Sequence, residues 1–179
     1  MYTFELRLAT TSDVDNLQTL IAESCRHLAV GDYSAEQIEA ALGSAWGVDT
    51  QLIHDATYFV AQSGHELIGC GGWSKRRTLF GADSASGRNA AELVPGCDAA
   101  KVRAFFVRPD WARRGVGRQI LERCETEARQ AGFNAVELMA TLPGARLYAA
   151  MGYVAQDAVT VTLPAGVPID FVPMHKIMM

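Results

Sequence analysis

The chain has 179 residues, of which 49% are hydrophobic, and a formal net charge of -4 at pH 7. This length and composition can bury a complete core, so we expect one domain that covers residues 1–179. The negative charge gives no basic face for nucleic acid, and no apolar stretch suits a signal peptide or a membrane span. We therefore expect a cytoplasmic protein with neither a nucleic-acid nor a membrane partner.

The first part of the chain predicts a strand, two capped helices and a hairpin. In chain order these elements cover residues 4–9, 12–31, 34–42, 58–62 and 67–73. The helix starts are predicted from two patterns that are typical of capping boxes, Ser12-Asp13-Val14-Asp15 and Ser34-Ala35-Glu36-Gln37. Gly31 ends the first helix.

A loop rich in Gly, Ala and Ser follows between Lys75 and Cys97 and has no clear periodicity. Loops of this length in a compact domain are usually functional or disordered. One hypothesis is a flap on the acceptor side of a site, and a merely mobile insertion is equally compatible with the sequence. Segment 31–33, between the first two helices, is a candidate for the opposite wall.

The next elements are a strand over residues 102–107 and an amphipathic helix from about Gly115 to Ala131. The turn between them reads Val107-Arg108-Pro109-Asp110-Trp111-Ala112-Arg113-Arg114-Gly115-Val116-Gly117-Arg118. Backbone N–H groups at a helix start have no partner within the helix and bind anions, and glycines allow close approach. We therefore predict a phosphate site at the 113–118 loop, with charge from Arg113, Arg114 and Arg118.

Two common phosphate motifs do not fit this loop. A Walker A loop has Lys followed by Ser or Thr after its last glycine, whereas Arg118-Gln119 follows Gly117. The dinucleotide fingerprint has a third glycine where this chain has Ile120. The stretch instead resembles motif A of the GCN5-related N-acetyltransferases, the GNAT superfamily, in which loop amides hold the pyrophosphate of acetyl-CoA. Ala112 departs from that motif, since it replaces a Gln or Arg.

A second stretch resembles motif B of the same family, which places a Tyr four residues before a Gly and an aromatic residue. Leu147-Tyr148 and Gly152-Tyr153 fit this spacing after the alternating strand 136–140. Together the motifs imply a mixed α/β GNAT fold, with a twisted, mostly antiparallel sheet of about six or seven strands and about four helices. The tail predicts two further strands, over residues 154–163 and 169–177.

The resemblance implies acetyl-CoA as the cofactor and an amine as the acceptor, with a small molecule favoured over a protein. It also implies a set of cofactor-binding residues: Phe105, Phe106, Val107, Arg113, Arg114, Gly115, Val116, Gly117, Arg118, Thr141 and Tyr148. Tyr148 stands where the family has a general acid that protonates the leaving thiolate. A homodimer is also compatible with the family.

The general base is open at this point. The strand that often supplies a Glu reads Lys101-Val102-Arg103-Ala104, without a carboxylate. Glu137 on the next strand is the catalytic candidate, because the resemblance places a catalytic Glu there in some members, but its position in an alternating strand favours an exposed polar residue over a base. Other candidates are Glu92, Asp98, His54 and His65, and a chain of waters could also remove the proton.

The cysteines and histidines predict no metal site, because they show no ligand spacing. No Cys lies in either motif, which favours direct transfer over an acetyl-cysteine intermediate, and Cys97 is the nearest exception. Two alternative functions are a sensor that binds acyl-CoA without turnover, and an acyltransferase with another acyl donor or acceptor.

Overall fold

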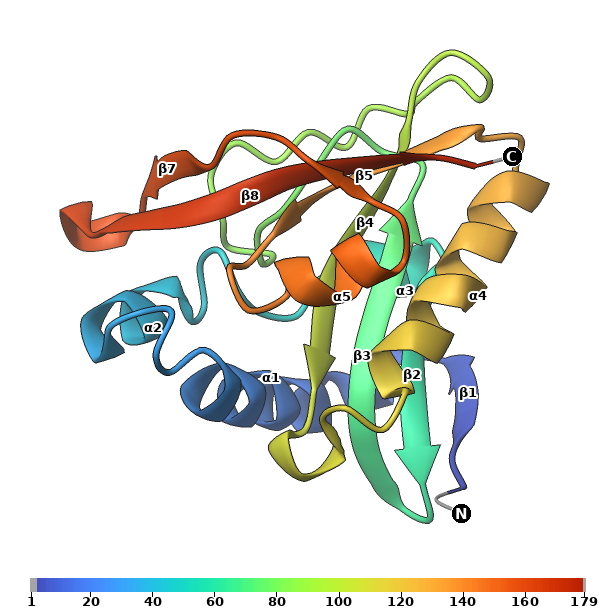
Figure 1. Ribbon diagram of the computed structural model, residues 1–179. Helices are drawn as coiled ribbons and strands as arrows, with labels where there is room; N and C mark the ends of the chain where they lie inside the picture. Colours follow the sequence, from blue (N-terminus) through green and yellow to red (C-terminus); the bar gives the residue numbers. More distant parts are fainter. Residues whose placement is uncertain (1–2, 179) are drawn as a thin grey trace.

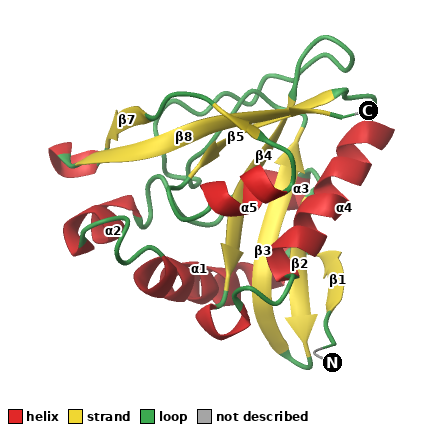
Figure 2. Cartoon of the chain, in the orientation of Figure 1, coloured by secondary structure: helices red, strands yellow, loops and turns green. Residues whose placement is uncertain are grey.

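The computed structural model describes residues 3–178. It is a mixed α/β structure with one twisted sheet (Figures 1 and 2). The eight strands are β1 (Glu5–Leu8), β2 (Tyr58–Ser63), β3 (Glu66–Ser74), β4 (Ala100–Val107), β5 (Ala135–Ala140), β6 (Val154–Ala155), β7 (Val159–Thr162) and β8 (Pro168–Ile177). The α-helices are α1 (Val14–Leu28), α2 (Ala35–Ala41), α3 (Thr50–His54), α4 (Val116–Gln130) and α5 (Ala145–Ala150).

The strand order is β1-β2-β3-β4-β5-β8-β6, and β7 pairs with β8. Every pair is antiparallel except β4 with β5, which are parallel and pair only at Ala100–Val136 and Lys101–Glu137. Beyond Lys101 the two strands diverge, so that β1–β4 and the strands from β5 onward form two wings (Figure 1). The site described below lies where the two strands diverge.

Each face of the sheet has its own core cluster. Leu17, Leu20 and Ile21 of α1 pack with Ile38 of α2 on one face. On the other face α4 buries a stripe that includes Ile120. The two clusters cover both sides of the sheet, which explains why β2 and β3 are buried along almost their whole length.

Two glycines of β3 let neighbouring elements approach closely. A Cβ at Gly69 would lie 2.6 Å from Cγ1 of Val116, in the first turn of α4. A Cβ at Gly71 would lie 2.6 Å from the ring of Phe105 on β4. A side chain at either position would therefore displace the start of α4 or the strand that lines the site.

The predicted elements are found, with differences in number and bounds. The sheet has eight strands instead of six or seven, because the strand expected over residues 154–163 is divided into β6 and β7. There are five α-helices instead of four, because one turn of helix, α3, follows the N-cap Asp49. This turn is too short to show an apolar periodicity in the sequence.

One predicted cap is correct and the other is wrong. Ser34 and Gln37 form the predicted capping box at α2, with Gln37 N donating to Ser34 Oγ at 3.2 Å. The Ser12 box is wrong: the N-cap residue is Thr10, whose N–H donates to Oδ2 of Asp13 at 2.8 Å. A short 3-10 turn, Thr11–Asp13, precedes α1. The helix ends at Leu28, three residues before Gly31, where the sequence predicted its end.

Asp13 gives the fold an acid-sensitive contact. Both guanidinium nitrogens Nη1 and Nη2 of Arg7 donate to its carboxylate at 2.8 Å, and this hydrogen bonding lowers the pKa of Asp13 to about 2. The contribution to stability is complete above the unfolded pKa near 4 and is lost as the pH falls through about 2. We expect Asp13→Asn to flatten the decline of the urea midpoint between these pH values. Asp15→Asn, two residues further along in the first turn of α1, is the control, and an unchanged slope in Asp13→Asn would contradict the assignment.

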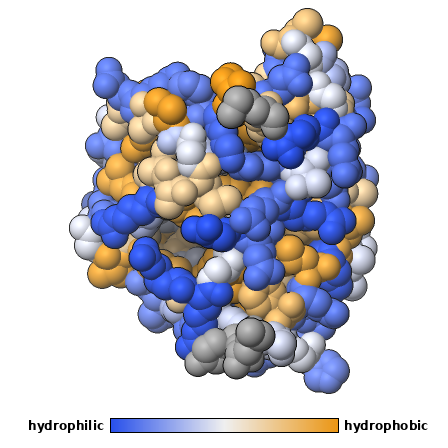
Figure 3. Space-filling model, turned by 45° about the vertical axis from the view of Figure 1, so that its right-hand side comes forward, coloured by the Kyte–Doolittle hydropathy of each residue, from blue (hydrophilic) through white to orange (hydrophobic). Residues whose placement is uncertain are grey.

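No helix within residues 3–178 is long and apolar enough to cross a membrane. In the same range no group of three or more Cys, His, Asp and Glu side chains is placed to hold a metal ion. Polar residues lie between smaller apolar patches over the face shown in Figure 3. The homodimer stays a prediction.

Candidate functional site

A cavity of about 390 Å³ lies where β4 and β5 diverge. Its wall is formed by segments from both wings of the sheet and from both faces. They are the second half of α1, residues 45–47, Phe80 and Gly81 of the long loop, residues 102–107 of β4, the start of α4, residues 139–148 and Phe171 of β8. The cavity therefore joins the two sequence motifs to parts of the chain that neither motif covers.

The structure brings most of the predicted cofactor residues to this cavity. The lining includes Phe105, Phe106, Val107, Arg113, Gly117, Thr141 and Tyr148. Four others lie in the same loop but outside the lining: Arg114, Gly115, Val116 and Arg118. Of these, Val116 is buried against β3, and the guanidinium of Arg114 stacks 5.4 Å above the ring of Trp111.

The cavity-lining part of β4 contains a β-bulge. Cys70 pairs with Phe106 and Gly72 with Arg103, so β4 has one residue more than β3 in this interval. Ala104 has a φ of 60°, in the left-handed region that is uncommon for a residue with a side chain. The hydroxyl of Tyr58 donates to the carbonyl of Ala104 at 3.1 Å and fixes this conformation from the far side. The bulge changes the direction of the strand where it borders the cavity.

The 113–118 loop has the backbone expected of an anion site. Arg113 and Gly115 both have left-handed φ values, 63° and 88°, and Gly115 is the N-cap of α4. α4 has 15 residues, and its N-terminus carries partial positive charge. A Cβ at Gly117 would lie 3.0 Å from Cδ2 of Leu147, so a glycine keeps α4 and α5 close together beside the cavity.

Tyr148 is buried with its side chain on the cavity wall. Its ring lies edge-on to Phe105 at 6.1 Å and to Tyr153 at 5.7 Å, so two aromatic neighbours fix its orientation. Burial is the largest cause that raises the pKa of Tyr148 above its usual value. The phenol therefore remains protonated at neutral pH and can act as a proton donor.

Glu137 is not brought to the cavity. Its carboxylate forms an ion pair with Lys101 at the end of β4 where the two strands are still joined. The other base candidates, Glu92, Asp98, His54 and His65, are also absent from the lining. Among the described residues the cavity wall includes no Asp, Glu or His.

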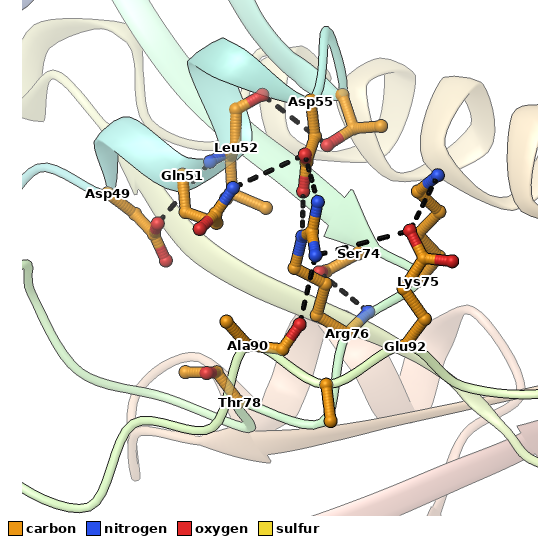
Figure 4. Close-up of polar contacts among 12 residues, drawn as sticks. Asp49, Gln51, Leu52, Asp55, Ser74, Lys75, Arg76, Thr78, Ala90 and Glu92 are labelled. Carbon is orange, nitrogen blue, oxygen red and sulfur yellow. Dashed lines mark hydrogen bonds and ion pairs between the residues drawn. The ribbon is translucent and has the colours of Figure 1, made fainter.

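The long loop is anchored at several points and reaches the cavity. Arg76 donates to both oxygens of Asp55, the C-cap of α3, at 2.6 and 2.8 Å, and to the carbonyl of Ala90 at 2.9 Å (Figure 4). Glu92 pairs with Lys75 at 3.1 Å. These contacts fix the two ends of the loop to each other and to α3, while Phe80 and Gly81 form part of the cavity wall. The acceptor-side flap stays a prediction.

Segment 31–33, the predicted opposite wall, is not part of the cavity wall. The ring of Tyr33 instead packs 5.5 Å from that of Trp46, which lines the cavity. The Tyr33 hydroxyl donates to the carbonyl of Asp170 at 2.6 Å and accepts from Leu142 N at 2.9 Å. Tyr33 thus supports the wall from behind.

The sequence reasoning missed a buried charged cluster beside the cavity. Asp49, fully buried, accepts from Arg103 Nε at 2.6 Å and from Arg88 Nη2 at 2.9 Å. Arg103 lines the cavity, as do Trp46 and Phe171. An arginine within the otherwise apolar stretch 102–107 was the one available indication, because a charge in a buried strand requires a partner.

Comparisons with known proteins agree with this arrangement. A family model for the acetyltransferase (GNAT) domain matches residues 54–155, more than half of the chain, so this protein belongs to the GNAT acetyltransferase family. No protein in a search of curated sequences matches.

Solved structures show the same fold. A GCN5-related N-acetyltransferase from Rhodopseudomonas palustris, whose description also reads "Aminotransferase, Class-II", is 21% identical with a TM-score of 0.72, over 99% of this chain and 98% of that chain. The PaiA N-acetyltransferase from Thermoplasma acidophilum, in complex with coenzyme A, is 16% identical with a TM-score of 0.65, over 98% and 99%. YncA from Salmonella typhimurium, a putative acetyltransferase with acetyl-CoA, is 17% identical with a TM-score of 0.60, over 99% and 95%.

Proposed function

We propose that the protein is an acetyl-CoA-dependent N-acetyltransferase that transfers the acetyl group directly to an amine. One observation carries the proposal: a single cavity joins the start of α4, the bulged edge of β4 and the protonated phenol of Tyr148. Membership of the GNAT family supports it, as do the coenzyme A and acetyl-CoA in the similar structures from T. acidophilum and S. typhimurium.

The proposed binding mode follows the two halves of the cavity wall. The backbone of the 113–118 loop, with the charge of Arg113, would bind the pyrophosphate. The pantetheine would lie along residues 105–107, where β4 has no paired strand on its β5 side within the described chain. Thr141 and the ring of Tyr148 would border the thioester.

The wall favours an amine that loses its proton to water. Its charged residues are Arg103, Arg113 and Arg146, all cationic. Cations near an ammonium group lower its pKa, so bound amine is more readily neutral than free amine. Water can then carry away the proton, and Glu137 gains no support as the base.

The proposed reaction exchanges the C–S bond of the thioester for a C–N bond and an N–H bond of the amine for the S–H bond of CoA. The neutral amine nitrogen attacks the thioester carbon and forms the C–N bond, and the C–S bond breaks. Tyr148 donates its proton to the departing thiolate, whose thiol has an ordinary pKa near 8.5, and regains a proton from solvent. The proton lost by the amine balances the one given to CoA.

Direct transfer is favoured over an acetyl-cysteine intermediate. Cys97, the exception noted in the sequence, is exposed and outside the cavity, whereas Cys25 of α1 lines it. Burial raises the pKa of Cys25 to about 12, so its thiol stays protonated and is a weak nucleophile.

A thermal-shift measurement tests the cofactor assignment. A ligand at about 100 times its Kd that binds only the native state adds ~2.7 kcal/mol, which for a domain of this size raises Tm by roughly 5–11 °C. We expect this shift with acetyl-CoA and with CoA but not with ATP. If neither acetyl-CoA nor CoA produced a shift, the proposal would be contradicted. If both produce a shift, thiol release with a panel of amines tests for turnover. A shift without turnover would favour the sensor.

A further inference from the structure

We propose that the acceptor is an amine that also carries a carboxylate on a small apolar body, such as a free aromatic or aliphatic amino acid, and that Arg103 binds the carboxylate. The inference rests on the proposed N-acetyltransferase function. It names a substrate class and a specificity-determining residue for the same cavity.

The body of the acceptor would occupy the aromatic part of the cavity. Trp46, Phe80 and Phe171 line this part, with ring centroids 6.5 Å apart for Trp46 and Phe171 and 5.6 Å apart for Phe80 and Phe171. Ala29 and Ala45 complete the apolar lining. Such a wall favours an apolar side chain over a polar or highly charged one.

Arg103 has one donor group left over. Arg103 is only 5% exposed. Two of its three side-chain nitrogens donate hydrogen bonds, Nε to Asp49 and Nη1 to the carbonyl of Thr78, both at 2.6 Å. Nη2 is buried without a hydrogen-bond partner in the described structure. A buried donor without a partner is costly, and a carboxylate oxygen is the strongest acceptor for a guanidinium.

A second residue of the same wall, Trp46, also has an unpartnered donor. Nε1 of Trp46 is buried and has no partner among the described residues. Thus both unpartnered buried groups that belong to cavity-lining residues are N–H donors. A ligand with oxygen acceptors suits this wall, whereas a ligand with only donors, such as a polyamine, does not.

The charges lead to the same conclusion. Asp49 is shared by two arginines, Arg103 and Arg88, at 2.6 and 2.9 Å, so the buried cluster has one positive charge more than it has negative charges. No acidic residue lines the cavity to balance it. A ligand carboxylate would complete the cluster, while a lysine side chain or a polyamine would add repulsion.

Matched acids and amides test the inference directly. We would measure thiol release at saturating acetyl-CoA with phenylalanine, leucine and methionine, each beside its amide. A charged hydrogen bond is worth enough to give each acid roughly 10–100-fold higher kcat/KM than its amide. The ammonium group of the amide loses its proton more easily than that of the acid, so protonation alone would make the amide the faster substrate. A preference for the acid therefore has to come from binding of its carboxylate. Equal values, faster amides, or transfer only to amines without a carboxylate would overturn the inference and leave the proposed function intact.

Two variants distinguish Arg103 from its surroundings. Arg103→Lys keeps a positive charge beside Asp49 but lacks the second N–H arm, so we expect the ratio of acid to amide to fall to about 3-fold or less. Arg88 is the other arginine paired with Asp49, and it does not line the cavity. Arg88→Lys should therefore keep the wild-type ratio of acid to amide. An unchanged ratio in Arg103→Lys would overturn the role of Arg103. An acetyl-CoA thermal shift equal to wild type in both variants checks that they are folded.

A binding measurement keeps the inference separate from turnover. In the CoA complex, calorimetry should show N-acetyl-phenylalanine binding roughly 10-fold or more tightly than N-acetyl-phenylalaninamide. Equal binding, or binding of neither compound, would overturn the inference. If acetyl-CoA bound but no amine caused thiol release, the proposed function would be contradicted instead. The calorimetric comparison would still show whether the cavity binds a ligand carboxylate.

Discussion

Replacing Tyr148 with Phe is expected to lower kcat by about 10²–10⁴-fold, the usual contribution of a general acid. The phenol lines the cavity and is held between the rings of Phe105 and Tyr153. Phe fills almost the same space and keeps both ring contacts, so the substitution removes the proton donor and little else. The measurement is thiol release at saturating acetyl-CoA and acceptor, together with the acetyl-CoA thermal shift, which should remain at its wild-type value.

Tyr153→Phe is the matched control. Tyr153 is also buried and adjacent, but it does not line the cavity, and its hydroxyl has no hydrogen-bond partner in the described structure. Its kcat should stay within about 3-fold of wild type, because no group in the reaction loses a proton donor. If both variants retained full activity, the leaving thiolate would need no protein acid, and the role assigned to Tyr148 would be wrong.

The pKa of Tyr148 also sets a pH expectation. Burial raises this pKa above its ordinary value near 10, so the phenol is protonated throughout the neutral range. Activity should therefore rise with pH as more of the amine becomes neutral, and Tyr148 would cause a decline only above about pH 10. A decline that begins near pH 7 would have to come from another group.

Local patterns predicted the part of the site that consists of consecutive residues. The glycines of the 113–118 loop and the spacing from Tyr148 to Gly152 are features of short segments, and both segments meet at the cavity. Residues 105–107 are also found there, since a strand that runs into the loop must end beside it. Each of these positions depends on backbone geometry that the neighbouring residues largely determine.

Contacts between distant segments could not be predicted in this way. Asp49 lies 39 residues before Arg88 and 54 before Arg103, and the three meet only because the N-cap of α3 and the long loop come together beside β4. Glu137 shows the converse. Its place in an alternating strand allowed a catalytic role, but the register that pairs β4 with β5 puts Lys101 beside it.

The bulge in β4 was hidden for a similar reason. Ala104 is an ordinary strand residue in the sequence, and its left-handed φ depends on the register with β3 and on the hydroxyl of Tyr58. The fold class was therefore predictable from local patterns, whereas the part of the cavity wall that contains Trp46, Arg103 and Phe171 depends on tertiary packing.

Asp49→Ala is expected to destabilise the protein by about 3–5 kcal/mol, the usual cost of breaking a buried ion pair by removing one partner. Asp49 is fully buried and accepts from Arg103, Arg88 and the backbone N–H of Leu52, at 2.6, 2.9 and 3.4 Å. Without it, two guanidinium groups lose their shared anion and α3 loses its N-cap. For a domain of this size Tm should fall by roughly 6–20 °C, measured by circular dichroism.

Two further variants decide whether this cost comes from the buried charge. Glu39→Ala removes an ion pair with Arg26 that is exposed on both sides, and Tm should remain unchanged. Asp49→Ala combined with Arg103→Met removes both partners of the shortest contact, so part of the lost stability should return. A double variant less stable than Asp49→Ala alone would show that Arg103 stabilises the fold even when the carboxylate of Asp49 is absent. Its positive charge would then be balanced within the protein, and the argument that it awaits an anionic acceptor would lose its electrostatic basis.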